Sequence, residues 1–321
     1  MRQPLRDIAA AQHGAFSTAQ AMSCYSRGEL RALVSSGGWS GMFTGSYRLS
    51  SAEPGPRLRL SAAGLSIGRE VPACLHTAAE LHGFGVLDDV VTHVAVRPDE
   101  PCARRAELWP HQLALTADDV VRLRCGALAT NADRTAIDLA RILPRLDVLP
   151  VLDAALAAGV CTPGSLAAEL KRHTGFKGIR QARELMPLAR PEPESPQESR
   201  LRLRCHDAGL PTPTAQFPVL DSRGRPCRWL DLAWEDVKVG LDYDGEEGHT
   251  GRANLRSDRR RHNFLQDDGW AMFYATDLDV YRDFAELMRK VGTAIKRRTR
   301  GLGADQGQMV AREDRLAAIS P

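Results

Sequence analysis

Hydrophobic positions in the first 50 residues are spaced for three short helices, and two short strands follow them. Leu5, Ile8 and Ala9 share one helical face, and a second short helix comes next. Ser26 and Glu29 have the spacing of a capping box, which predicts a third helix that ends at a pair of glycines. The pattern therefore predicts a small helical module that ends in a β-ribbon.

The predicted ribbon consists of strands at 39–43 and 46–49 around a tight turn. Helices followed by such a ribbon have the order of a winged helix, which places the second helix of its pair in the major groove. Arg27 and Arg31 lie on that helix, and Arg48 on the ribbon is placed to touch a phosphate. We expect DNA binding here; the alternative is a module of this kind that serves protein contacts only.

The middle of the chain alternates between helical and extended patterns. Arg134 and Asp138 are four residues apart on one predicted helix, and a structural ion pair explains them. Four histidines of this region lack the compact spacing of metal ligands and are interpreted as structural or solvent-exposed. They are His76, His82, His93 and His111. Helices are predicted at 57–68, 74–83, 132–143, 149–158, 165–172 and 179–188, and strands at 92–98, 107–115 and 120–130.

Two proline-rich stretches, 50–57 and 188–198, interrupt these patterns and mark domain boundaries. Directly after the second stretch comes a helix start, with Ser195 as N-cap and Pro196 at the first helical position. The pattern that follows predicts the order α-β-β-β-α-β-α. Its strands are predicted at 214–220, 227–234, 237–243 and 270–275, and its helices at 196–208, 256–266 and 280–295.

Acidic residues gather on the third strand of this region. Alternation places Asp242 and Asp244 on the same face as Gly240. A hairpin turn at 235–236 then puts Asp231 opposite Gly240 and diagonal to Asp242, within reach of one shared ion. Converging carboxylates are costly without a cation, and hard oxygen ligands select Mg²⁺ or Mn²⁺. Such an ion activates water and neutralises a phosphodiester transition state.

The alternative interpretation of these acidic residues is a solvated loop. It explains Glu246 and Glu247 well, because they follow the strand end. It does not explain Asp231, which lies in an otherwise apolar strand and would be expensive to bury without a partner. A metal site is therefore the favoured prediction.

Composition narrows the class of protein. A length of 321 residues predicts two or three domains. The chain lacks an apolar run long enough to span a membrane and lacks the pattern of a signal peptide, so we expect a cytoplasmic protein without a membrane partner. Seven scattered cysteines without a Cys-x-x-Cys pair favour reduced thiols. A net charge of +3 permits a polyanionic partner but does not require one.

The C-terminal third contains a set of short motifs: Ser195–Glu198, Trp229–Asp231, Leu241–Gly245, His249, Arg256–Arg261 and Gly269–Trp270. In this combination, about 100 residues of the chain resemble the Vsr-like (very-short-patch repair) branch of the PD-(D/E)xK endonucleases. The resemblance implies a restriction-endonuclease-like fold that binds and cuts DNA with Mg²⁺ or Mn²⁺.

The resemblance also implies roles for single residues. Glu198, Asp231 and Asp242 would hold the metal, Asp244 would help to place the ion or a water molecule, and His249 would assist proton transfer. Two positions depart from the pattern. Asp242 stands where the family usually has Glu, and Asp244 stands where the wider superfamily has Lys. These departures put rapid turnover in doubt more than metal binding.

Basic residues surround this acidic region. Arg252, Arg256 and Arg260 follow His249 closely, and we expect them to hold DNA phosphates. The alternative for any such charge run is a solvated surface.

A second resemblance covers about residues 1–190. It rests on the motifs Gly14–Phe16, Gly37–Trp39, Gly45–Arg48, His76–Ala79, Leu81–Gly83, Asp133–Thr135 and Asp138–Ala140. These resemble the N-terminal part of AbiEi-type antitoxins and regulators of bacteria. The resemblance implies a winged-helix DNA binder that is associated with phage defence or toxin–antitoxin systems.

Together these observations predict a multidomain α/β (α+β) protein. Its segments would be a winged helix-turn-helix at 1–50, a mixed α/β domain at 57–190, a Vsr-like nuclease-type domain at 195–300 and a flexible tail at 301–321. The first functional hypothesis is a DNA-binding protein with a Mg²⁺-dependent endonuclease domain, acting in phage defence or DNA repair. The alternative is a non-catalytic AbiEi-type regulator with a degenerate nuclease fold. DNA and a cognate toxin or a repair or defence protein are the expected partners.

Overall fold

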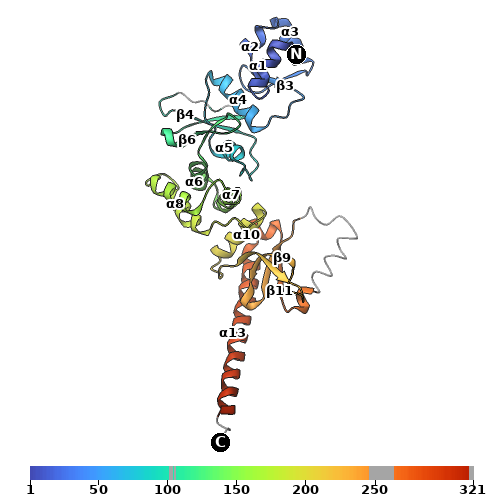
Figure 1. Ribbon diagram of the computed structural model, residues 1–321, viewed down its shortest axis with the longest axis vertical. Coiled ribbons are helices and arrows are strands. Elements are labelled where there is room, and N and C mark those ends of the chain that lie inside the picture. Colours follow the sequence, from blue (N-terminus) through green and yellow to red (C-terminus); the bar gives the residue numbers. More distant parts are fainter. Residues whose placement is uncertain (101–103, 105, 246–263, 318–321) are drawn as a thin grey trace. The chain divides into compact units, whose positions relative to one another are not determined.

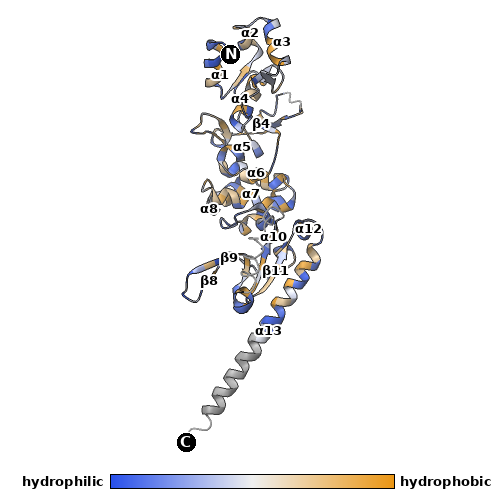
Figure 2. Ribbon diagram, turned by 90° about the vertical axis from the view of Figure 1, so that its right-hand side faces the viewer, coloured by the Kyte–Doolittle hydropathy of each residue, from blue (hydrophilic) through white to orange (hydrophobic). Residues whose placement is uncertain are grey.

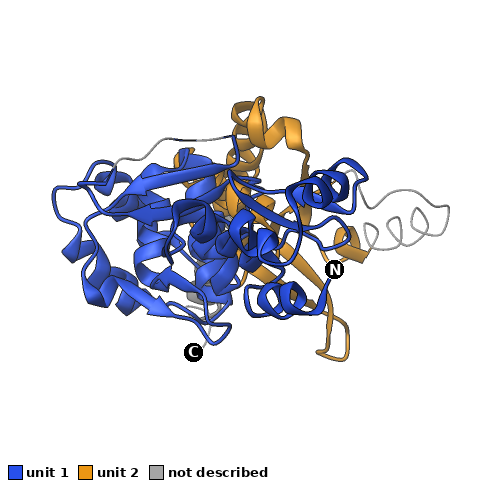
Figure 3. Cartoon of the chain, turned by 90° about the horizontal axis from the view of Figure 1, so that it is seen from above, with its two compact units in different colours: residues 1–191 blue, residues 192–321 orange. Residues whose placement is uncertain are grey.

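A computed structural model shows a mixed α/β protein that divides into two compact units. It describes residues 1–100, 104, 106–245 and 264–317, with side chains up to residue 301. Unit 1 spans Met1–Pro191 and unit 2 spans Glu192–Pro321 (Figure 3). In the described part of the chain, every helix is too short or too polar to cross a membrane.

Unit 1 begins with a module of three helices and a three-stranded sheet. In this antiparallel sheet, β3 lies between β1 and β2. Phe16 and Trp39 pack edge to face in its core, with ring centroids 4.8 Å apart. Both predicted strands and all three helices of this segment are present, whereas β1 was missed. The elements are α1 (Gln3–Ala11), β1 (Ala15–Ser17), α2 (Thr18–Met22), α3 (Arg27–Ser35), β2 (Trp39–Gly41) and β3 (Ser46–Leu49).

The rest of unit 1 combines two pairs of strands with a group of helices (Figure 1). β4 pairs with β5 in parallel, and β6 pairs with β7 in an antiparallel hairpin. The prediction of one strand over 120–130 was therefore wrong, because the chain turns back at Gly126, whose φ is +84°. The elements are α4 (Pro56–Ile67), α5 (Leu75–His82), β4 (Thr92–Val96), β5 (Leu108–Gln112), η1 (Ala117–Asp119), β6 (Val120–Arg122), β7 (Leu128–Thr130), α6 (Ala132–Ile142), α7 (Arg145–Ala157), α8 (Pro163–Arg172), α9 (Ile179–Leu185) and η2 (Met186–Leu188).

Unit 2 is built on a four-stranded mixed sheet of order β11-β10-β9-β8. β8, β9 and β10 are antiparallel neighbours, and β11 runs parallel to β10. One core cluster includes Leu201 of α10, Leu241 of β10 and Val291 of α13. The elements are α10 (Pro196–Asp207), β8 (Thr214–Leu220), β9 (Pro226–Trp234), η3 (Glu235–Val237), β10 (Val239–Tyr243), β11 (Ala271–Ala275), α12 (Asp277–Tyr281) and α13 (Phe284–Ala317).

The last helix differs from its prediction. One helix was expected over 280–295, but the chain forms the short α12 and then the long α13, which continues to Ala317. Figure 2 shows hydrophobic and hydrophilic residues alternating around the first turns of α13, and Leu287, Val291 and Ile295 are buried there. Apolar periodicity thus marks the turns whose side chains are buried, and the sequence that follows them has little such periodicity. The predicted helix at 256–266 lies mostly outside the described residues.

The register between β9 and β10 differs from the prediction by two residues. The connection is not a two-residue turn, because η3 is followed by Lys238 in a left-handed conformation with φ +46°. Gly240 therefore pairs with Ala233, not with Asp231. Continuing this pairing by one step places Asp231 directly opposite Asp242. A shift of two residues keeps each side chain on its expected face, since side chains alternate with a period of two.

Candidate functional site

Three carboxylates of unit 2 meet where β9, β10 and the first turn of α10 come together. Asp231 accepts a hydrogen bond at Oδ2 from the Tyr243 backbone N–H, at 2.7 Å. Asp242 accepts one at Oδ1 from the Asp231 backbone N–H, at 3.1 Å. Glu198 is buried on α10, where its backbone N–H donates to the capping Ser195 hydroxyl. The structure thus brings together the three residues that the sequence predicted as metal ligands.

Burial and neighbouring charges shift the pKa values of Asp231 and Asp242. Burial, followed by the charge of Asp242, raises the pKa of Asp231 to about 7, and Glu198 contributes in the same direction. Burial also raises the pKa of Asp242, although the Arg228 guanidinium opposes that shift. A raised pKa at Asp231 is the expected effect of a carboxylate held in a buried place beside other carboxylates, with only partial compensation by positive charge.

The positive charge at this cluster comes from Arg228, which the sequence analysis missed. Its Nη2 donates to Asp242 Oδ2 in a largely buried ion pair. Its Nε is also buried and has no hydrogen-bond partner among the described residues. Both oxygens of Asp242 are therefore engaged, one by Arg228 and one by the backbone of Asp231. Arg228 partly takes the place that a cation would have beside these carboxylates.

Gln216 supports the cluster through an irregularity in β8. The β8–β9 pairing passes from Ala215↔Leu232 to Phe217↔Leu230, and Gln216 lies between them with φ +48°. A positive φ is costly for a residue with a side chain, so it persists only where the surroundings impose it. Here the Gln216 side-chain N–H donates to Glu198 Oε2 at 2.7 Å. The same oxygen also accepts from the Glu194 backbone N–H at 2.9 Å.

The donor set suits a hard cation in its chemistry, because three carboxylates supply oxygen ligands. Its geometry is not that of a preformed metal centre. Among the residues that the structure describes, no group of three or more His, Cys, Asp or Glu side chains is placed to hold a metal ion. Binding an ion here requires Asp242 to exchange Arg228 for the metal.

Of the other site residues predicted for unit 2, Asp244 is the one that lies within the described part of the chain. Asp244 is half-buried at the end of β10, and its backbone N–H donates to the Ala275 carbonyl at 2.7 Å. The proposed proton-transfer residue His249 and the basic residues Arg252, Arg256 and Arg260 lie outside the described residues.

In unit 1, the predicted DNA-contacting residues lie on the N-terminal module. Arg27 and Arg31 are exposed on α3, one turn apart. Arg48 on β3 is occupied within the protein, because its Nη1 donates to the carbonyls of Leu49, Ser50 and Ala52 at 3.0, 3.0 and 2.6 Å. α3 therefore presents the more available cations.

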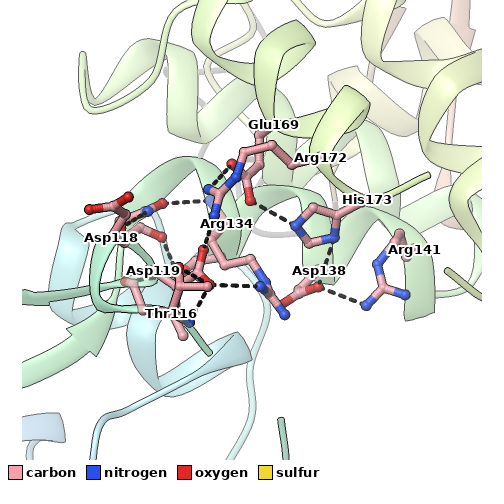
Figure 4. Close-up of polar contacts among 12 residues, drawn as sticks. Thr116, Asp118, Asp119, Arg134, Asp138, Arg141, Glu169, Arg172 and His173 are labelled. Atoms are coloured by element: carbon pink, nitrogen blue, oxygen red, sulfur yellow. Dashed lines mark hydrogen bonds and ion pairs between the residues drawn. The ribbon is translucent and has the colours of Figure 1, made fainter. Parts of the chain in front are cut away.

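A buried polar network joins α6 to η1 and α8 (Figure 4). Arg134 donates to Asp138 at 2.6 Å on the same helix and lies 3.4 Å from Asp119 of η1. The ion pair predicted from the spacing is thus present, within a larger set that sequence spacing alone did not reveal. Its other members are Thr116, Arg141, Glu169, Arg172 and His173. The ion pairs and hydrogen bonds of this network tie α6, η1 and α8 together, so its residues are explained as structural.

Three of the four histidines considered in the sequence analysis, His76, His93 and His111, lie close together. His93 Nδ1 is 2.8 Å from His111 Nε2, and His93 Nε2 is 2.9 Å from Asp89 Oδ2. His76 Nε2 lies 3.8 Å from the same Asp89 oxygen. His82 lies apart from this group and contacts the Thr130 carbonyl. Burial is the first cause that lowers the pKa values of His76, His93 and His111, so these imidazoles are neutral structural groups at pH 7.

Comparisons with known proteins concern both units. Residues 71–188 match the family model described as the AbiEi antitoxin C-terminal domain. An uncharacterized protein of Mycobacterium tuberculosis (strain CDC 1551 / Oshkosh) is 33% identical over 271 residues, which cover 84% of this chain and 97% of that protein. An uncharacterized protein of the strain ATCC 25618 / H37Rv matches to the same extent.

Proposed function

The chain belongs to the same family as these two mycobacterial proteins, and from that premise we propose that it is a DNA-binding regulator of the antitoxin type. The observation that carries the proposal is the match of residues 71–188 to the AbiEi antitoxin C-terminal domain. A separate small helical module precedes this segment, as a DNA-reading module would. A cognate toxin is the protein partner that this function implies.

The N-terminal module supports the proposal through its order of elements. α2 and α3 are followed directly by the β2–β3 ribbon, which is the order of a winged helix. α3 is the second helix of this pair, and its Arg27 and Arg31 are exposed to solvent. Guanidinium groups bind phosphates by charge-assisted hydrogen bonds, which provide affinity but little sequence information.

The test is a binding titration with a labelled duplex at several salt concentrations. Replacing Arg27 and Arg31 together by Ala removes two phosphate contacts, so the slope of log affinity against log salt should become shallower by about 2. The matched control replaces Arg180 and Arg183, which are exposed on α9, by Ala. Equal affinity and equal salt slope for both double variants would remove α3 as the DNA-binding helix.

A second candidate function is metal-dependent hydrolysis of DNA phosphodiesters in unit 2. The convergence of Glu198, Asp231 and Asp242 on one site favours it. These residues would hold Mg²⁺ or Mn²⁺, Asp244 would help to place the ion or the attacking water, and His249 would move the proton. When bound, such an ion neutralises phosphate charge and acidifies water. Arg228, once released from Asp242, would have a guanidinium free to bind a phosphate oxygen.

Incubation of the protein with supercoiled plasmid and Mg²⁺ or Mn²⁺ tests this candidate. Nicking should appear for the wild type and fall by orders of magnitude in Asp231→Asn, which keeps size and hydrogen bonding but loses charge. His249→Ala should cost about 10²–10⁴-fold, as expected for the loss of one general acid or base. Wild-type protein that is inert with both ions on duplex and single-stranded DNA would leave the regulator as the function.

A further inference from the structure

A cavity of unit 1 lies between the N-terminal module and the segment that follows it. Its volume is about 650 Å³, which is within the range of small-molecule sites. Three stretches of chain line it: residues 11–17 at the end of α1 and in β1, residues 57–71 on and after α4, and residues 122–128 of the β6–β7 hairpin. No function described above uses this cavity.

The polar side of the cavity is positively charged. Arg57, Arg69 and Arg122 line it together with a single carboxylate, that of Glu70. Arg122 already neutralises Glu70, since two of its nitrogens donate to the two carboxylate oxygens at 2.8 and 2.9 Å. This bidentate contact also lowers the pKa of Glu70. The positive charge of the lining that Glu70 does not neutralise therefore comes from Arg57 and Arg69.

Arg57 is the most available of these cations. Its guanidinium is exposed and, among the described residues, forms no hydrogen bond or ion pair. Arg69, by contrast, pairs with Glu100 and donates to the Glu70 carbonyl. An uncommitted guanidinium at the entrance of a cavity can bind a phosphate with two parallel hydrogen bonds at no cost to an existing pair.

The remaining walls of the cavity are partly apolar. Leu60, Val71 and Ala127 are buried members of the core cluster beneath the cavity, and Leu65 and Leu128 add to its apolar lining. Ser17 and Ser61 supply hydroxyl groups beside them. A cavity of this volume is much larger than a free phosphate requires, and its lining combines an apolar floor with a cationic rim.

We propose that this cavity is a binding site for a nucleotide, with its phosphates on Arg57 and its base over Leu60 and Leu65. Because the lining comes from both the N-terminal module and the following segment, the bound nucleotide contacts both. A ligand that bridges two structural parts favours one of their arrangements by its difference in affinity. The site would thus let a nucleotide influence the DNA-binding module, and its existence does not depend on that module binding DNA.

The experiment is calorimetric titration of the full chain with ADP, and in parallel with adenosine and with pyrophosphate. ADP should bind more tightly than either of its parts. Arg57→Ala should weaken ADP binding by about tenfold or more, as expected for the loss of a charge-assisted hydrogen bond. Arg57→Lys should restore part of that affinity, and Ser61→Leu should weaken binding of ADP and of adenosine by filling the cavity.

Arg180→Ala on α9 is the matched control and should leave ADP binding unchanged. Absence of measurable heat with ADP and with pyrophosphate overturns the proposal. Equal ADP affinity of the wild type, Arg57→Ala and Ser61→Leu also overturns it, because the nucleotide would then bind elsewhere. A loss of DNA affinity in Arg57→Ala without any nucleotide binding would assign Arg57 to the DNA interface instead.

Discussion

Asp231 has an energetic cost in the folded protein and is also a residue of the proposed metal site. Burial and the neighbouring carboxylates raise its pKa to about 7, so ionising it at neutral pH works against folding. Arg228 forms an ion pair with Asp242. Its charge also lowers the pKa of Asp231, but this effect is smaller than those of burial and of Asp242. A position that destabilises the metal-free protein is the expected result where side chains are arranged for a ligand.

We therefore predict that Asp231→Asn stabilises the protein in chelator at pH 8, by roughly 1–3 kcal/mol. The sign follows from the raised pKa. The folded state prefers the protonated carboxyl, so the native Asp is favourable at low pH and becomes unfavourable as pH rises from about 4 through about 7. The gain should vanish near pH 4. Urea unfolding at pH 4, 6 and 8 measures it.

Asp242→Asn is the contrast for this experiment. It has a similar shape but leaves the Arg228 guanidinium buried without its ion pair, so stability should fall at pH 8. If Asp231→Asn also destabilises the protein at pH 8, the close carboxylates do not repel each other as the structure indicates.

Single residues were predictable from the sequence to different degrees. The acidic residues stood out because Asp231 interrupts an apolar strand. Arg228 and Gln216 did not, because their roles depend on the irregularity in β8 and on the register of β9, which alternation alone does not determine. Spacing found the Arg134–Asp138 pair but could not find Asp119 or Glu169, which come from other elements.

At the scale of elements, capping residues were the reliable signals. The Ser26–Glu29 capping box and the N-caps at Asn131 and Ser195 are all present. The strand β1 was missed because three residues are too few for a periodic pattern. The β9–β10 connection was predicted two residues too short, because a left-handed Lys238 gives no sequence signal comparable to glycine.

The histidine group gives a prediction for the elements β4, β5 and α5. Burial first, and then the charge of His93, lowers the pKa of His111 from 6.5 to about 4. As pH falls, His111 therefore takes up its proton at a higher pH in the unfolded chain than in the folded chain. Stability from this group is complete at pH 7 and is lost as pH falls from about 6.5 to about 4. Partial exposure screens the effect, so we expect a loss on the order of 1–2 kcal/mol.

His111→Asn should reduce this acid sensitivity, because Asn has no proton to gain in this pH range. The measurement is urea unfolding of the wild type and the variant at pH 7 and at pH 4.5. For each protein, the quantity compared is the difference in unfolding free energy between the two pH values. His206→Asn, on α10 in unit 2, is the control and should show the wild-type change. An unaltered change in His111→Asn would mean that other groups, and not His111, cause the acid sensitivity.

At the scale of the whole molecule, the two proposed activities occupy different compact units. The DNA-contacting arginines lie in unit 1 and the carboxylate cluster lies in unit 2. The candidate residues for DNA binding and those for metal binding are different residues in different units. Substitutions in unit 1 should therefore leave the metal affinity of unit 2 unchanged, and substitutions in unit 2 should leave DNA affinity unchanged. Changes at independent sites without shared partners usually add in free energy.

This independence gives the last prediction. Isothermal titration with Mn²⁺ should give the same affinity for the wild type and for the Arg27→Ala, Arg31→Ala double variant, while Asp231→Asn should lose the signal. Titration with duplex DNA in chelator should show weaker binding for the double variant and wild-type binding for Asp231→Asn. The reason is that the arginines supply phosphate contacts and Asp231 supplies none. A variant that combines all three substitutions should show both losses, each of its separate size. If Asp231→Asn instead weakens DNA binding in chelator as much as the double variant does, the carboxylate cluster is part of the DNA-binding surface. The division of labour between the units would then be wrong.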